Sequence, residues 1–296
     1  MSRPKRQHYV PQFVLRRFAV DGDSDRVWVF DKLRGEARLQ AIRDSAHETY
    51  FYERADLSRV GLNLEAKLAE FEGAVAPILE TVCNEQSLLS ITADTRLALV
   101  DFALVQLFRT RAAREFAKQG AQASFGIELD EDTAQQASFA SLLRDFSRYR
   151  ALCVNHILTL REALPAERFL LGDSVTLLVR PPDGPKDTLT TILTSATILV
   201  PIAPALCLMF FPAMREADLA EAGEWYRQDI RTLTEPQPTM PTEAESTNTM
   251  SVVAANRFLY SPVNEFSVCV RTIAAYPTAV GGPIGGWEEA RPSGGG

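Results

Sequence analysis

The stretch from Ala196 to Met214 contains no charged residue, and it constrains the fold more than any other feature of the sequence. Its length approaches that of a membrane-spanning helix, which needs about 20 apolar residues. However, Pro201, Pro204 and Pro212 interrupt it, and a proline inside a helix removes a hydrogen bond and clashes with the preceding turn. We therefore expect two buried strands joined by a turn at the sequence APA, and no transmembrane segment.

Apolar spacing elsewhere predicts both kinds of secondary structure. Stripes at helical spacing indicate three long helices between residues 62 and 164. The segments 26–32 and 36–42 indicate a β-hairpin, and strand-like segments return after Pro165. We therefore expect an α+β fold with an N-terminal β-hairpin, a central block of three long helices, and a C-terminal part that mixes strands and helices.

The length of 296 residues suits one large domain or two small ones. We expect a single domain over residues 1–280, with a helical middle at about 62–164, whose third helix covers 131–164, and a strand-rich part at about 166–276. Within these parts we expect a loop at 118–132, helices at 216–230 and 242–260, and a last strand at 265–276. The glycine-rich residues 281–296 are expected to form a disordered tail.

The composition excludes some functions. A net charge of −7 argues against a protein that coats nucleic acid. The sign is uneven, because residues 1–43 hold ten Lys and Arg against five acids. This basic segment could attract a phosphate-bearing partner or dock onto the acidic remainder of the chain. The four cysteines lie far apart beside apolar neighbours, which predicts buried free thiols. Polar residues interrupt the first apolar run, so we expect a cytoplasmic protein without a secretory signal.

The first candidate site is the stretch KRQHYVPQFVLRRFA at residues 5–19. Pro11 suits the first position of a short helix, since its missing N–H is not needed there. Gln12 and Arg16 would then share one face of that helix, with His8 just before it. These polar side chains inside an apolar segment are candidates for an acid or base at His8 and for substrate binding at Gln12 and Arg16.

The long helices carry further candidates. Glu65 and Glu72 lie seven positions apart on the edge of an apolar stripe, where paired carboxylates could hold a divalent metal or act as acid and base, or could form a solvated flank. Arg109 and Arg111 follow the next apolar helix, and Arg111 continues the line of its buried face. A buried guanidinium needs a carboxylate or an anionic ligand. These arginines are thus candidates for phosphate binding or for salt bridges.

Asp173 is the last candidate. It lies in a turn signal between two apolar runs, RFLL and VTLLV, and polar tips between buried strands often carry catalytic side chains. The alternative is an Asx turn in which the carboxylate binds its own backbone.

Several of these segments resemble one family. The segments are QHYVPQFVLRRFA, YFY, NLEAKLAEFE, QLFRTR, FLLGDSVTLL, ILVPIAPALCLMF and ANRFLYSP. In this order the chain resembles, over about residues 6–262, a large bacterial family of unknown function with an N-terminal His-Tyr-Val-Pro motif, followed here by Gln12. The family tends to have threonine or serine before the aspartate and proline shortly after it, whereas this chain has Gly172 and Ser174-Val175. The resemblance implies homology and no particular activity.

Two functions are compatible with these residues. In the first, the N-terminal helix folds back so that His8, Gln12 and Arg16 meet the carboxylates and arginines in one polar pocket of a hydrolase that acts on a phosphoester or nucleic acid, with a possible divalent metal. In the second, the same residues form a buried structural network in a non-catalytic binding or regulatory protein.

Overall fold

The computed structural model of the chain describes residues 6–49, 64–181, 189–212 and 225–281, with some side chains in its helices and strands left out. Helices and sheets both contribute, so the predicted α+β class is confirmed. The helices are α1 Gln12–Leu15, α2 Leu64–Glu85, α3 Ala93–Phe108, α4 Arg111–Phe125, α5 Glu131–Val154, α6 Leu189–Ser195, α7 Glu243–Ala254 and α8 Ser267–Ala275. The expected tail lies outside the described residues, apart from Gly281.

Three sheets hold the described strands. The seven-stranded sheet has the order β10-β11-β5-β9-β8-β7, with β12 also paired to β5, and the four-stranded sheet has the order β3-β2-β13-β6. A two-stranded sheet pairs β1 with β4. The strands are β1 Arg6–His8, β2 Arg26–Asp31, β3 Glu36–Ala41, β4 His47–Thr49, β5 Ile157–Glu162, β6 Leu171–Gly172, β7 Leu177–Val179, β8 Thr197–Ala203, β9 Leu206–Phe211, β10 Tyr226–Arg227, β11 Thr232–Leu233, β12 Gln237–Pro238 and β13 Phe258–Ser261.

The uncharged run folds as the sequence predicts. β8 and β9 pair antiparallel from Ile198 with Phe210 onward, and Pro204 and Ala205 form the turn between them. The register shifts between Pro201 and Ala203, as expected where a proline lacks the N–H that a regular ladder needs. No helix among the described residues is both long and apolar enough to cross a membrane.

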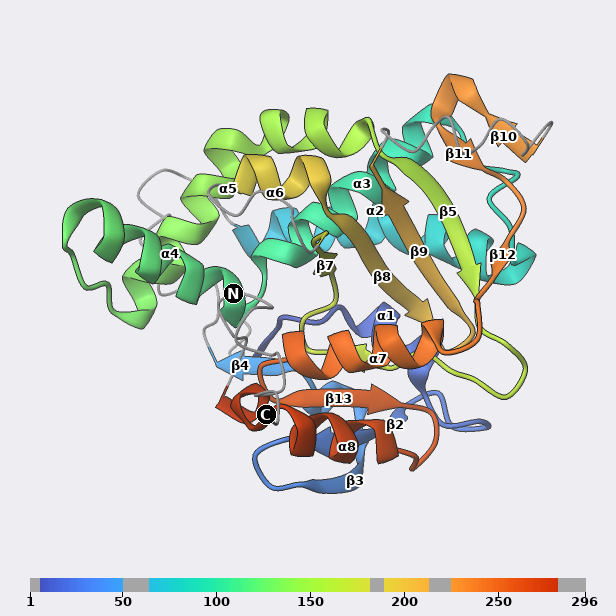
Figure 1. Cartoon of the computed structure of the whole chain (residues 1–296), viewed down its shortest axis with the longest axis horizontal. Helices are drawn as coiled ribbons and strands as arrows, with labels where there is room; N and C mark the ends of the chain where they lie inside the picture. Colours follow the sequence, from blue (N-terminus) through green and yellow to red (C-terminus); the bar gives the residue numbers. More distant parts are fainter. Residues whose placement is uncertain (1–5, 50–63, 182–188, 213–224, 282–296) are drawn as a thin grey trace, which may run out of the picture.

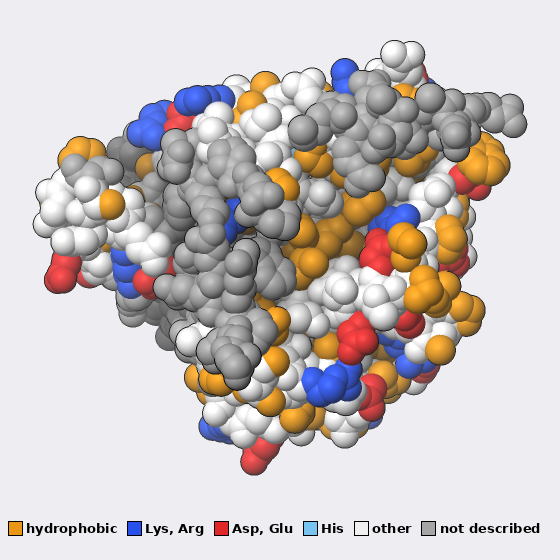
Figure 2. All heavy atoms as spheres, viewed as in Figure 1, with side chains coloured by type: hydrophobic (Ala, Val, Ile, Leu, Met, Phe, Trp, Pro, Cys, Tyr) orange, Lys and Arg blue, Asp and Glu red, His pale blue; other side chains and the backbone are white. Residues whose placement is uncertain are grey.

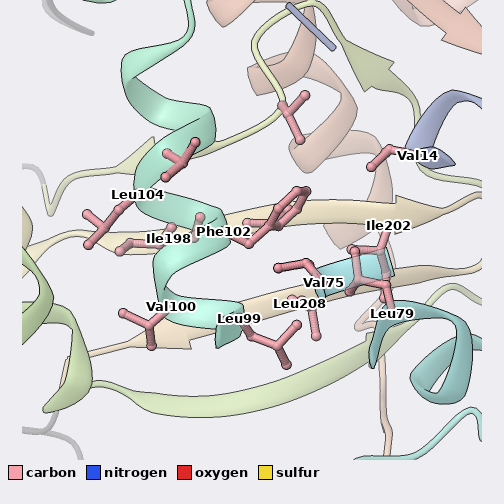
Figure 3. Packing of buried hydrophobic residues seen from close by; sticks show 14 of the residues in the cluster. Val14, Val75, Leu79, Leu99, Val100, Phe102, Leu104, Ile198, Ile202 and Leu208 are labelled. Atoms are coloured by element: carbon pink, nitrogen blue, oxygen red, sulfur yellow. The ribbon is translucent and has the colours of Figure 1, made fainter. Parts of the chain in front are cut away.

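The main core lies between this hairpin and the long helices (Figure 1). α2 and α3 cover one face of the seven-stranded sheet. Side chains of α3 such as Phe102 meet Ile198 of β8 and Val75 of α2 in one cluster, which Val14 of α1 also joins (Figure 3). The N-terminal segment is thus fixed by apolar burial, at roughly 1.5–3 kcal/mol for a buried Val or Leu side chain.

The opposite face of the sheet is apolar as well. Leu199 and Cys207 pack there with Ala244 of α7, and orange side chains fill the middle of the face seen in Figure 2. The four cysteines are free, with Cys83 half-buried and the other three buried, as the sequence predicts. Strands buried on both faces explain why this part of the sequence reads as a continuous apolar run.

The helical block differs from the expected three helices, because the described part contains four. Residues 111–125 form α4, although we expected a loop from residue 118. Thr110 caps its first turn by accepting a hydrogen bond from the Ala113 N–H, and Gly126, with a φ of 66°, ends it in the left-handed conformation. These capping signals outweigh the polar, small-residue composition that suggested a loop.

Other expected elements also change type. α5 ends at Val154, and residues 157–162, expected to be helical, form β5 between β9 and β11. Residues 267–275 form α8 instead of a strand, with Cys269 and Thr272 buried at helical spacing. Residues 258–261 form β13, and 226–230 a short strand and a 3₁₀ turn, instead of helix ends. The remainder of the expected helix at 216–230, residues 216–224, lies outside the described part.

Thr92 begins α3 with a capping box, and we predict a measurable loss when it is removed. Its hydroxyl accepts from the Thr95 N–H at 3.3 Å, while the Thr95 hydroxyl accepts from the Thr92 N–H at 2.8 Å. Thr92→Ala should lower the free energy of unfolding by about 1 kcal/mol in urea titrations followed by circular dichroism. Ser90→Ala, an exposed loop control, should change it by less than about 0.5 kcal/mol; equal losses would contradict the capping role.

Candidate functional site

Two histidines face each other next to the N-terminal helix. His8 ends β1 and His47 begins β4, and the two are directly paired in the antiparallel register. Their rings make an edge-on contact, with centroids 5.7 Å apart and planes at 73°. Ala46 precedes His47 with a φ of 51°, which is costly for a residue other than glycine, and its carbonyl accepts from the Tyr9 N–H at 2.9 Å. The chain thus holds His47 opposite His8 through a strained residue.

The His8 ring is oriented by its neighbours. The Gln12 amide nitrogen lies 3.2 Å from Nε2 and 3.4 Å from Nδ1 of His8, and Nε2 lies 3.3 Å from the Arg43 carbonyl oxygen. In the tautomer with the proton on Nε2, the ring donates to the Arg43 carbonyl and Nδ1 accepts from the Gln12 amide. Arg16, one turn further, donates from Nη2 to the Gln12 Oε1 at 3.1 Å. His8 and Gln12 are partly exposed and Arg16 is exposed. The predicted grouping of these three side chains is therefore present on one accessible face.

Arg109 ties this face to the helices. It follows α3, is buried, and forms an ion pair with Glu72 of α2 through Nη1. Its Nη2 donates to the His8 carbonyl at 2.5 Å. The guanidinium thus holds the backbone of the N-terminal segment against α2 and α3, as the planar donor fork of arginine allows. Of the predicted site residues, His8, Gln12, Arg16, Glu72 and Arg109 lie together.

Two predicted residues cannot be placed in the site. Glu65 lies in α2 and Arg111 begins α4, but their side chains are outside the described part of the structure. The pairing of Glu65 with Glu72 around a metal therefore stays a prediction. Among the described residues, no three His, Cys, Asp or Glu side chains gather in a way that could hold a metal ion.

Asp173 takes a buried position instead of the expected polar tip. The strands on either side of it belong to different sheets, β6 to the four-stranded and β7 to the seven-stranded one. Its carboxylate accepts from the backbone N–H groups of Asn256, Arg257 and Phe258 at 2.6, 2.8 and 3.0 Å. The partners lie more than 80 residues away, so it forms no Asx turn with its own segment. Burial raises the pKa of Asp173, and the three N–H groups oppose this rise.

Lys32 and Asp31 complete this buried network. The Lys32 ammonium donates to the carbonyls of Val252, at 2.7 Å, and Ala255, where α7 ends. Burial lowers the pKa of Lys32 to about 8, and the charge of Asp173 opposes this shift. Asp31 accepts two hydrogen bonds from Arg257, at 3.0 and 2.7 Å. Burial would raise the pKa of Asp31, but its contacts with Arg257 outweigh burial and lower it.

The sequence offered weak signals for the residues that we did not single out. His47 lies 39 positions after His8, and only the pairing of β1 with β4 brings the two together. Lys32 directly follows the apolar strand β2 and is buried by α7, which lies 220 residues further along the chain. Arg96 is buried in α3, four positions before Val100, and therefore lies on the same helix face. From the sequence we extended this face only toward the C-terminal end of the helix, to Arg111.

One family comparison gives a result. The model of a family described as "Protein of unknown function (DUF4238)" matches the N-terminal half. A domain of unknown function, DUF4238, spans residues 6–151. This span contains the two histidines and Arg109, whereas Asp173 and Arg257 follow it. No curated protein and no solved structure matches the chain.

Proposed function

We propose that this chain is a hydrolase that acts on phosphoester bonds, nucleic acid included, at the face formed by β1, β4 and α1. The edge-on contact between His8 and His47 carries the proposal, because these are two of only three histidines in the chain. Histidine is the side chain best suited to proton transfer near neutral pH. Two such groups side by side supply both the acid and the base that hydrolysis requires.

The chemistry follows from this pair. One imidazole takes a proton from the attacking water, and the other gives a proton to the leaving oxygen as the P–O bond breaks. Arg16, exposed beside Gln12, supplies positive charge for the phosphate. Arg109 is occupied by Glu72 and the His8 carbonyl, so it positions His8 without binding substrate. The excess of basic residues over acids in residues 1–43 also favours an anionic substrate.

Hydrolysis assays test this function. We would measure cleavage of bis(p-nitrophenyl) phosphate, a short single-stranded RNA and a short single-stranded DNA, with added Mg²⁺, Mn²⁺ or Zn²⁺ and with a chelator. His8→Ala and His47→Ala should each lower the rate by about 10²–10⁴-fold, the usual contribution of general acid–base catalysis. The wild type should show a bell-shaped pH profile. Arg271→Ala, on the exposed side of α8, should keep the wild-type rate. Absence of cleavage of all three substrates, or wild-type rates in both histidine variants, would contradict the proposal.

A second candidate is a non-catalytic binding or regulatory protein, and the buried network favours it. The observed hydrogen bonds of Asp173, Lys32 and Arg109 all go to other groups of the chain. In that case His8→Ala and His47→Ala would lower the unfolding temperature of a protein that cleaves none of the substrates. Measuring stability beside activity therefore separates the two functions.

A further inference from the structure

Three arginines converge on one buried carboxylate, that of Asp31 at the end of β2. Its Oδ2 lies 2.7 Å from Nη2 of Arg257, 3.7 Å from Nη1 of Arg38 and 3.8 Å from Nε of Arg34. The first arginine directly precedes β13, the second lies in β3, and the third lies in the turn between β2 and β3. These strands adjoin in the four-stranded sheet along the lower edge of the molecule (Figure 1). Because all three arginines approach the same oxygen atom, their guanidinium groups are neighbours.

The carboxylate satisfies only one of these arginines. Arg257 donates to both oxygens of Asp31, at 3.0 and 2.7 Å. Arg34 and Arg38 pair with it electrostatically, but their distances of 3.8 and 3.7 Å are too long for hydrogen bonds. Among the described residues, the guanidinium of Arg38 donates only to the Gln40 side chain, at 2.9 Å, and that of Arg34 to none. Charged donors therefore remain available beside Asp31.

The same guanidinium groups are ordered and accessible. The Cζ atoms of Arg38 and Arg257 lie 5.6 and 4.8 Å from the centroid of the Phe258 ring. These cation–π contacts restrict both side chains before a ligand arrives, which lowers the entropic cost of binding. The side chains of Arg34, Arg38 and Arg257 are 66%, 42% and 35% exposed. A ligand can thus reach all three arginines from solvent.

The charge of the cluster favours a dianion. Three guanidinium groups against the one carboxylate of Asp31 leave an excess of two positive charges. Glu36, directly opposite Asp31 in the register, is exposed and forms no ion pair with the arginines in the described part of the chain. A phosphate monoester carries about two negative charges near pH 7, and arginine forks match its oxygens. A carboxylate or one phosphodiester of a nucleic acid carries a single charge and would neutralise only half of the excess.

We propose that Arg34, Arg38 and Arg257 bind a phosphate dianion, inorganic phosphate or a phosphate monoester, beside Asp31. None of their described hydrogen bonds and ion pairs goes to a residue of β1, β4 or α1. The proposal therefore does not depend on the hydrolase function. It agrees with the excess of basic residues in residues 1–43, which includes two of the three arginines.

Calorimetric titration with inorganic phosphate tests the site. The reference protein carries Arg16→Gln, so that phosphate bound at the β1–β4 face does not contribute. We expect 1:1 binding and a rise in unfolding temperature that chloride at equal ionic strength does not give. Arg34→Gln and Arg38→Gln should each weaken binding about tenfold, because each removes a charged donor and leaves the hydrogen bonds of Asp31 in place. Arg271→Gln, which removes an exposed arginine on α8, should leave the affinity unchanged.

Glu36→Gln should have the opposite effect. It removes a negative charge next to the cluster and no donor, so phosphate should bind about two- to fivefold more tightly. Arginines that served only to hold Asp31 would give no such gain.

Two results would overturn the site. One is the absence of both binding heat and a phosphate-specific rise in unfolding temperature, and the other is unchanged affinity in both Arg34→Gln and Arg38→Gln. Adenosine 5′-monophosphate identifies the source of the phosphate. Tighter binding than inorganic phosphate, weakened by Arg34→Gln, would support a nucleotide, and equal or weaker binding would support phosphate itself.

Discussion

Replacing Asp173 by alanine should lower the free energy of unfolding by about 3–5 kcal/mol, the range for removing one partner from a buried charged network. One carboxylate accepts hydrogen bonds from three consecutive backbone N–H groups, at residues 256–258, and the variant would leave all three buried without a partner. It would also remove the buried negative charge that faces Lys32. Urea titration followed by circular dichroism measures the change.

Two further variants sharpen this prediction. Asp173→Asn keeps one acceptor oxygen, so we expect a smaller loss than for alanine. Asp145→Ala breaks an exposed pair with Arg144, and surface pairs contribute about 0–1 kcal/mol. If Asp173→Ala costs no more than Asp145→Ala, the network does not stabilise the fold. The hydrogen bonds of Asp173 go to the backbone of residues 256–258 and not to the two histidines, so the folded fraction of Asp173→Asn should hydrolyse phosphoesters at the wild-type rate.

Local chemistry explains what could be predicted of the fold. The turn between β8 and β9 follows from prolines within a few residues of it, and the start of α3 follows from Thr92 and Thr95. Both features need only neighbouring residues. The same holds for Gln12 and Arg16, since spacing by four on a helix places two side chains together.

Where the predicted secondary structure was wrong, tertiary contacts determine whether the segment forms a strand or a helix. Residues 157–160 are all buried, and a short apolar run fits a strand or a buried helix equally well. Its pairing with β9 and β11 selects the strand. In residues 267–275 the apolar side chains fit both periods, and packing against α7 selects the helix, which buries Cys269 and Thr272.

The candidate site also combines features that follow from neighbouring residues with features that depend on tertiary contacts. The sequence marks Asp173 as unusual but cannot show that its partners lie more than 80 residues away. It also cannot pair His8 with His47, because the contact depends on two short strands separated by the whole β2–β3 hairpin. The sequence thus reveals which polar residues lie in apolar segments, whereas their contact partners can be identified only once the topology of the fold is known.

The second large effect concerns pH and Lys32. Burial lowers its pKa in the folded protein to about 8, from 10.5 for an exposed lysine. Between these values the unfolded chain binds a proton that the folded chain does not, so the contribution to stability is smallest below pH 8 and rises with pH up to 10.5. At about 1.4 kcal/mol per pH unit, the rise over this window amounts to about 3 kcal/mol.

Lys32→Met isolates this contribution. The variant loses the hydrogen bonds to the Val252 and Ala255 carbonyls, so it should be less stable than the wild type at every pH. The difference between the two unfolding free energies, from urea titrations at pH 7.5 to 10.5, should be smallest at pH 7.5 and increase steadily above pH 8. Lys67→Met, on the exposed side of α2, controls for the loss of one lysine. A difference independent of pH would show that Lys32 stays protonated throughout, held by Asp173 and the two carbonyls despite its burial.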